Sequence, residues 1–404
     1  MEKNISASKL FQASCFALIT TAMTFAIRAK LELVFNEQYS LTLQEIGSAF
    51  APAFWGFTLA MMIGGFFVDL FGMKRIMNFA FLGHLLGIVV TIFARDYWTL
   101  FWGTTLIGVA NGLVEAACNP LVATLYPKEK TKMLNRFHVW FPGGIVIGSV
   151  LGFLIMDVMN MSWMILVATL IIPLLIYGKL FLNAQFPQTE RVASGVSYGD
   201  MVANCFKPLF IFMILCMMLT AATELGTGQR ISSLLGESVT SPILVLAFIN
   251  GLMALGRLYA GEIVHRLSIT NMLIFSAVFS CIGLFLLANT SGAMTFVSAT
   301  VFAIGVCYFW PTMLSFVSEK IPESGALGLS LMGGAGMLSV SFVLPQMGKL
   351  MDENVTGSEA LMIMGYIPAL LIVAFTLLHF YVKAKKYEKE KSIIIFNHKI
   401  YLKI

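Results

Sequence analysis

Apolar runs of about 20 residues recur along the whole chain, and each run ends in a short polar or Gly/Pro-containing stretch. A helix of that length crosses the ~30 Å hydrocarbon core of a bilayer, so the pattern predicts twelve membrane-spanning helices. They lie at about 8–34, 43–70, 76–94, 98–125, 137–159, 163–183, 208–232, 242–265, 270–290, 293–317, 327–350 and 359–382. The predicted fold class is an all-α polytopic membrane protein.

The longest internal polar stretch contains NAQFPQTERVASGVSYGD, which has the composition of a linker, and it divides the spans six and six. We therefore predict an N-terminal six-helix bundle at 1–183, a cytoplasmic linker at 184–207, a C-terminal six-helix bundle at 208–382 and a cytoplasmic tail at 383–404. The halves also match each other weakly at a nearly common offset. LIGVANG recurs as AIGVCYF and IMD recurs as LMD, which suggests two parallel six-helix repeats.

Composition supports the membrane assignment, because 58% of the residues are hydrophobic and 12% are charged, too apolar for a soluble domain of this size. The net charge of +5 comes from cations in the loops, so we expect no nucleic-acid partner. Six cysteines lie in or beside apolar runs without a CxxC pair. They signal neither a disulfide framework nor a zinc site, and we predict no metal and no cofactor.

Charge asymmetry predicts the orientation. With both termini inside, the cytoplasmic segments hold 21 of the 26 Lys and Arg residues, and the opposite side holds Arg28, Lys30, Arg95, Arg230 and Lys349. Two lysines precede the first apolar run without an obvious small-residue cleavage site, which indicates an uncleaved first helix. We expect a multi-pass protein of the cell inner membrane with both termini cytoplasmic.

The loop between the second and third spans reads GGFFVDLFGMKR. Gly65 would permit close helix packing and Gly72 a tight turn, and Asp69 would end the helix. Lys74 and Arg75 add cations, so the cluster could latch one conformation and release in another. Here the sequence resembles the major facilitator superfamily, whose signature loop occupies this position. That resemblance implies two six-helix bundles that rock around a central site.

Glu115 lies inside an apolar span, where a carboxylate is costly. Asn111 and Asn119 are spaced four residues to either side of it, so the three share a helix face. Such a stripe needs a wet cavity or a polar partner. A structural hydrogen bond or ion pair between helices is the alternative for Glu115, and relief of a backbone carbonyl freed by Pro120 is the alternative for Asn119.

The segment EAACNPLVATLYPKEKTKMLNRFHVWFPGG resembles the fucose–galactose–glucose:proton symporter family, with its E-x-A-x-N-P run on the fourth helix and a following loop ending in L-N. The resemblance implies sugar import driven by a proton gradient. It assigns Glu115 to the acidic residue of the central cavity, Asn119 to the family's Asn, and His138 to a cavity-lining position on the fifth helix. An interfacial role at a loop edge is the alternative for His138.

One departure concerns the first helix, where the family's acid is replaced by Ala29 between Arg28 and Lys30. Either Glu115 alone carries the proton, or coupling has been lost or changed, or the cations bind an acidic substrate. An i, i+4 pair with Glu32 is a further alternative for Arg28.

On the seventh span, Glu224 and Gln229 fall near the level of Arg28 in the repeat alignment. A salt bridge between Arg28 and Glu224 that gates the cavity is as plausible there as contact with a substrate.

These observations predict a secondary active transporter for a small polar solute, which we expect to be a sugar moved by proton symport with alternating access. The alternatives are an organic-anion or sugar-acid carrier, and a non-transporting nutrient sensor of the same fold. We do not expect an enzyme, because no span carries a nucleophile–base pair or a metal-ligand cluster. The expected partners are the solute, protons and the lipid bilayer, and we expect a monomer.

Overall fold

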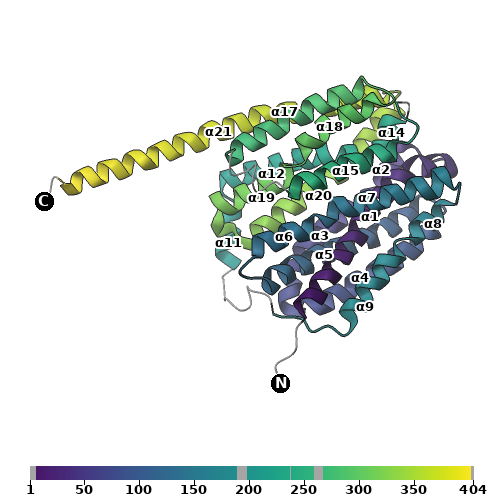
Figure 1. Ribbon diagram of the computed structural model, residues 1–404, viewed down its shortest axis with the longest axis horizontal. Coiled ribbons are helices and arrows are strands. Elements are labelled where there is room, and N and C mark those ends of the chain that lie inside the picture. Colours follow the sequence, from purple (N-terminus) through teal and green to yellow (C-terminus); the bar gives the residue numbers. More distant parts are fainter. Residues whose placement is uncertain (1–5, 189–197, 237, 259–266, 402–404) are drawn as a thin grey trace.

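The structure is a computed structural model that describes residues 6–188, 198–236, 238–258 and 267–401 (Figure 1). These residues are predominantly helical, and no strand occurs among them. The predicted all-α membrane fold is confirmed, with eleven helical stretches in the described residues long and apolar enough to cross a membrane. The predicted span at 242–265 is described only as the shorter apolar helix Pro242–Leu258, since residues 259–266 lie outside the described part.

Ten helical segments form the N-terminal half, and several predicted spans consist of two or three of them in succession. The segments are α1 (Ala7–Tyr39), α2 (Leu43–Phe50), α3 (Pro52–Phe71), α4 (Met73–Ile92), α5 (Tyr97–Leu125), α6 (Lys130–His138), α7 (Trp140–Gly152), the π-helix η1 (Phe153–Val158), α8 (Trp163–Ala168) and α9 (Ile171–Leu182). Proline at the first position of α3 explains the break after α2, because proline cannot donate the backbone hydrogen bond that would continue the helix.

The described C-terminal half consists of α12 (Pro208–Ala221), the π-helix η2 (Ala222–Gly226), α13 (Thr227–Gln229), α14 (Ile231–Leu235), α15 (Pro242–Leu258), α17 (Ile269–Ala288), α18 (Met294–Val306), α19 (Phe309–Lys320), the 3₁₀ turn η3 (Pro322–Ser324), α20 (Gly325–Asp352) and α21 (Gly357–Tyr401). The predicted linker contains a short helix, α11 (Tyr198–Cys205). Helix α21 runs on beyond Val382 and extends away from the bundle, so most of the predicted tail is helical (Figure 1).

Local sequence determines where several helices begin. Thr42 and Glu45 form a capping box at α2, and Asp96 and Thr99 form one at α5. In the second case the backbone N–H of Thr99 donates to the Asp96 carboxylate, which lowers the pKa of that carboxyl group below its usual range. Side-chain acceptors of this kind satisfy the amide groups that a first helical turn leaves unpaired.

The most extensive contacts between the two halves in the described residues are those of α2 and α3 with α20 and of α7 with α15, and α1 also packs on α13 and α14. We name the two ends of the bundle by their residues. The linker face holds the start of α1 at Ala7, the end of α3 at Phe71 and the linker helix α11. The far face holds the end of α1 at Tyr39, the start of α2 at Leu43 and the end of α20 at Asp352.

Candidate functional site

A chain of hydrogen bonds joins three of the predicted site residues. Asn119 Nδ2 donates to Glu115 Oε2 over 2.6 Å, and His138 Nε2 lies 2.9 Å from Asn119 Oδ1. Asn119 and Glu115 are one turn apart on α5, whereas His138 ends α6, so the loop between these helices brings the imidazole back to α5. The nitrogen and the oxygen of the Asn119 side-chain amide therefore each bond to another side chain.

A second polar pair faces this chain from the other half. Arg257 on α15 lies 3.3 Å from the carboxylate of Glu224 on η2, and Arg257 Nε also donates to the backbone oxygen of Cys307. The Arg257 guanidinium lies close enough to the His138 imidazole for the two groups to interact electrostatically. The polar groups of the two halves thus converge at their interface, where each half can contribute to one ligand site.

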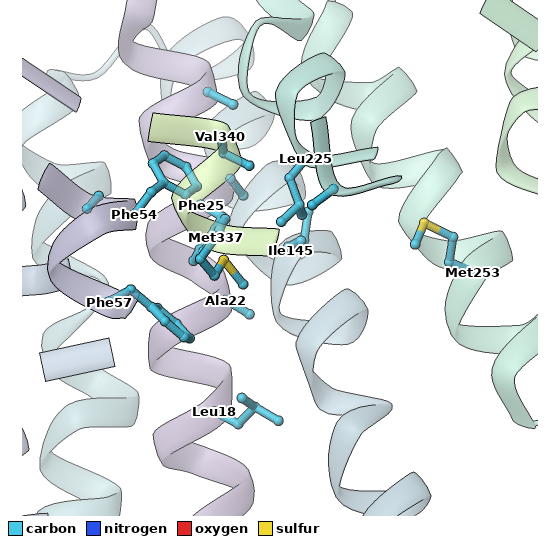
Figure 2. Packing of buried hydrophobic residues seen from close by; sticks show 14 of the residues in the cluster. Leu18, Ala22, Phe25, Phe54, Phe57, Ile145, Leu225, Met253, Met337 and Val340 are labelled. Atoms are coloured by element: carbon cyan, nitrogen blue, oxygen red, sulfur yellow. The ribbon is translucent and has the colours of Figure 1, made fainter. Parts of the chain in front are cut away.

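These side chains are enclosed without being fully buried. Glu115 is 8% exposed, and the side chains of Arg257 and Glu224 are 15% and 11% exposed. Beside Glu224, a narrow cavity between the halves is lined by Gln229, Asn250, Phe25 and Ile145 among others. Figure 2 shows Phe25 on α1, with Ile145 and Leu225 lying close together from opposite halves. A mostly apolar cavity with a few polar groups is the usual form of a small-molecule site.

Sequence reasoning missed Arg257. The signal that could have found it is a cation within the predicted span at 242–265, because an intramembrane ionisable residue usually marks a functional position.

Arg28 lies at the same interface, but the predicted pair with Glu224 is not formed in this structure. Arg28 Nε donates to Gln229 Oε1 over 2.9 Å, and the guanidinium stacks on the rings of Phe25 and Phe54 at 5.0 and 4.9 Å. Its Nη2 is buried and has no hydrogen-bond partner among the described residues. The repeat alignment gives only the height of a residue along its helix. Which residues of the two halves meet also depends on how each helix is rotated about its axis, and the alignment does not determine that rotation.

The alternative partner of Arg28, Glu32, is also engaged elsewhere. Glu32 on α1 forms a buried salt bridge with Arg230, and it accepts a hydrogen bond from Ser233. Arg230 Nη2 further donates to the backbone oxygens of Leu43 and Leu344. These contacts join the two halves at the far face, so that face is closed.

Asn111 is not brought to the Glu115 chain. Its side chain is fully buried, donates to Thr24 over 3.1 Å and accepts from His84 over 2.8 Å, while His84 Nδ1 lies 2.9 Å from the Tyr177 hydroxyl. Eight residues along a helix turn the side-chain direction by roughly 80°, so Asn111 and Asn119 cannot point the same way. The structure therefore places Asn111 in a network inside the N-terminal half.

The structure describes most of the loop in which the latch was predicted. Gly72 has φ +83°, as a tight turn between α3 and α4 requires, and the helix ends at Phe71. Lys74 Nζ donates to the backbone oxygen of Ala184 at the start of the linker, and Arg75 is exposed.

No described atom lies within 4 Å of where a Cβ on Gly65 would be, so this conformation does not show the close packing predicted there. The neighbouring Gly64 meets α5 instead. The side chain of Asp69 lies outside the described part of the structure.

Comparison with known proteins assigns the family. The Major Facilitator Superfamily matches residues 12–343, and the chain therefore belongs to this superfamily. Facilitated glucose transporter member 10 of solute carrier family 2 from Xenopus tropicalis is 26% identical over 142 residues, which are 35% of this chain and 25% of that relative. A probable chloroplastic anion transporter 6 of Arabidopsis thaliana is 24% identical over 36% of this chain and 28% of the relative. The chain thus matches about a quarter of the length of these relatives.

Solved structures share the fold at low sequence identity. The xylose transporter XylE from E. coli superimposes with a TM-score of 0.74 at 14% identity, covering 91% of this chain and 98% of that one. The nucleoside transporter NupG gives 0.73 at 13% identity, with 92% and 99% coverage. The E. coli fucose:proton symporter FucP gives 0.61 at 17% identity, with 90% and 98% coverage. Membership of the superfamily, shown by the match over residues 12–343, makes the protein a multi-pass membrane transporter rather than an enzyme.

Proposed function

We propose that this protein is a secondary active transporter that moves a small polyhydroxylated solute, a sugar, in symport with protons. The observation that carries the proposal is the chain His138–Asn119–Glu115, which faces Arg257 and Glu224 across the interface of the halves. Carboxylates, amides and guanidinium groups offer the paired donors and acceptors that bind sugar hydroxyl groups. The sugar-transporting relatives and fold neighbours agree with this class of substrate.

Glu115 is the proposed proton site. A carboxylate at the middle of a membrane span is stabilised as the neutral acid when its cavity closes and as the anion when water reaches it. In the present conformation its partner Asn119 donates a hydrogen bond to this carboxylate. Binding of a sugar hydroxyl in place of Asn119 would remove that bond, so substrate binding and proton uptake would depend on one another.

The linker face is the proposed cytoplasmic side, because the loops there carry most of the Lys and Arg residues. Both termini and the linker then lie in the cytoplasm, and the membrane is the cell inner membrane. With the far face joined by Glu32 and Arg230, the proposed direction of solute release from this conformation is toward the cytoplasm. The Gly72 turn with Lys74 and Arg75 is then the proposed cytoplasmic latch of the opposite state.

A sugar acid is a second candidate substrate, favoured by Arg28. Lys30, Arg230 and Arg257 each have a carboxylate partner, whereas Arg28 has a neutral amide and two aromatic rings. Its amide partner Gln229 lines the cavity between the halves, so a shift of Gln229 would present the guanidinium to a ligand. A buried cation without a countercharge is costly, and a substrate carboxylate would supply that charge.

The test is uptake by purified protein in proteoliposomes, with D-glucose, D-fucose, D-xylose and D-glucuronate as probes and with an imposed pH gradient. We expect gradient-driven accumulation of at least one neutral sugar. In Glu115→Gln, which mimics the protonated acid, accumulation should disappear while exchange of internal for external sugar continues.

Each result separates the candidates. Accumulation of glucuronate alone, abolished in Arg28→Gln, would replace the neutral sugar by the acid. Gradient-driven accumulation at the wild-type level in Glu115→Gln would exclude Glu115 as the coupling site. Failure of every probe to bind or exchange, with the protein folded, would refute this class of substrate.

A further inference from the structure

Asp352, the last residue of α20, reaches across to the other half. Its two carboxylate oxygens accept hydrogen bonds from the backbone N–H groups of Leu43 and Gln44, over 2.9 and 2.8 Å. These two amide groups open α2, and the first amides of a helix have no partner within the helix. The carboxylate therefore satisfies two free donors and also lies at the positive end of the helix dipole.

Asp157, near the end of η1, makes the corresponding contact in the opposite direction. Its Oδ2 accepts a hydrogen bond from the Ser241 hydroxyl over 2.5 Å, and its Oδ1 pairs with Lys30 Nζ over 2.5 Å. Ser241 immediately precedes Pro242, the first residue of α15 in the C-terminal half. This is the second contact in which an aspartate of one half meets the start of a helix in the other half.

The two contacts are related by the internal repeat. Asp157 ends the sequence IMD and Asp352 ends the matching LMD, at an offset of 352 − 157 = 195 residues. Their partners Leu43 and Ser241 are related by an offset of 241 − 43 = 198 residues. Each half therefore supplies one aspartate, and it also supplies the helix start that donates hydrogen bonds to the aspartate of the other half. A pseudo-twofold relation between the halves requires this arrangement.

Both contacts lie at the closed far face, and the Asp352 contact lies beside a close approach of two helices. A Cβ on Gly348, one turn before Asp352, would lie 2.3 Å from the Leu43 oxygen and 2.5 Å from Arg230 Nη2. The backbones of α2 and α20 approach each other so closely that Asp352 reaches the α2 amides directly. When the halves separate here, these amides and the Ser241 hydroxyl lose their acceptors from the other half.

We propose that Asp157 and Asp352 are a matched pair of clamps that hold the far face closed, and that both release when the protein opens there. The proposal rests on the alternating access of the proposed function but not on its substrate. Each clamp forms between the halves and not within one, so it acts on the equilibrium between conformations. Asp157 keeps Lys30 as its partner after release, since both belong to the N-terminal half. Asp352 exchanges its two helix amides for water.

The experiment measures the distance between spin labels at Glu37→Cys and Ser291→Cys, which are exposed far-face positions in opposite halves. Cys205 and Cys281 are replaced by Ser, because they are half-buried while the other four cysteines are buried. Protein in nanodiscs without added solute is compared as the parent, Asp157→Ala, Asp352→Ala and the double variant. The control is Glu353→Ala, since Glu353 directly follows α20 and pairs with Lys349 of the same half at 3.9 Å.

A hydrogen bond to a charged group contributes about one factor of ten to an equilibrium, so each single variant should raise the ratio of open to closed far face about tenfold. The double variant should raise it about a hundredfold, because the two clamps are separate and act on one equilibrium. The control should leave the ratio unchanged. Unchanged ratios in folded clamp variants would overturn the proposal, as would an effect of equal size in the control.

Two milder variants keep the test decisive if alanine prevents folding. Ser241→Ala removes the contact with Asp157 while leaving its pair with Lys30, and Asp352→Asn removes the charge at the start of α2. Both should open the far face to a smaller degree. No added solute enters the measurement, so a failure to find a sugar substrate would leave this result standing, and an unchanged ratio would leave the proposed substrate untouched.

Discussion

Glu32 and Arg230 form a salt bridge that joins the two halves of the protein inside the closed far face, with their side chains 2% and 1% exposed. Ser233 donates to the second Glu32 oxygen, and the Leu43 and Leu344 carbonyl groups accept from Arg230. Two charges are thus withdrawn from water with most of their hydrogen bonds satisfied. A pair of this kind specifies one arrangement of the halves, because either charge left alone in the interface is strongly unfavourable.

Replacing Glu32 with Gln should open the far face. Removal of one partner of a buried pair costs about 3–5 kcal/mol, and separation of the halves lets Arg230 regain water. We therefore expect a longer distance between labels at residues 37 and 291 rather than loss of folding. Adding Arg230→Gln should shift the population back toward closure. Strictly additive effects of the two substitutions would show that the residues are not coupled.

Gly47→Ala and Gly65→Ala should have opposite effects, because the first should disfavour the closed structure and the second should stabilise it. A Cβ on Gly47 would lie 2.5 Å from Arg230 Nη2 and 2.7 Å from the Leu344 backbone oxygen, so overpacking by about 1–3 kcal/mol should disfavour the closed far face. At Gly65 no described atom lies within 4 Å of the added Cβ, and alanine should stabilise α3 by about 0.5–1 kcal/mol. The measurement is transport rate together with thermal stability in detergent. Equal loss of transport in both variants would contradict the packing argument and would point to the latch at Gly65.

Glu224 should be coupled to Arg257 and not to Arg28. The first pair is in contact at 3.3 Å, whereas Arg28 bonds to Gln229. In double-mutant cycles of solute binding, Glu224→Ala with Arg257→Ala should cost less than the sum of the single changes. Glu224→Ala with Arg28→Ala should be close to additive. Coupling of Glu224 to Arg28 of comparable size would restore the gate pair that the sequence predicted, in a conformation other than this one.

Asn111→Ala should lower stability while leaving solute affinity unchanged. The substitution leaves buried Thr24 and His84 without the amide between them, and a buried unsatisfied group costs about 1–3 kcal/mol. Thermal unfolding and a binding isotherm for the transported solute distinguish the two properties. Asn119→Ala is the matched control, and it should weaken binding. A tenfold loss of affinity in Asn111→Ala with unchanged stability would return Asn111 to the binding site.

Sequence alone determined the features that depend on length, composition and local geometry. Bilayer-length apolar runs predicted the eleven spans of the described residues to within a few residues, because backbone groups in lipid must be satisfied within a helix. The turn at Gly72 followed from a residue that tolerates positive φ. Glu115 and Asn119 could be paired from the sequence, since residues four apart lie one above the other on a helix. The family resemblance added His138, which the structure also brings to Asn119.

Tertiary structure decided every partner that crosses between helices of different halves. Arg28 bonds to Gln229 instead of Glu224, Arg257 joins the site, and Glu32 pairs with Arg230. Nothing local selects these pairs, because they depend on how each helix is rotated about its axis and on which face of the protein is closed. In the proposed alternating-access cycle these contacts would change when the halves rock, which the sequence alone does not specify.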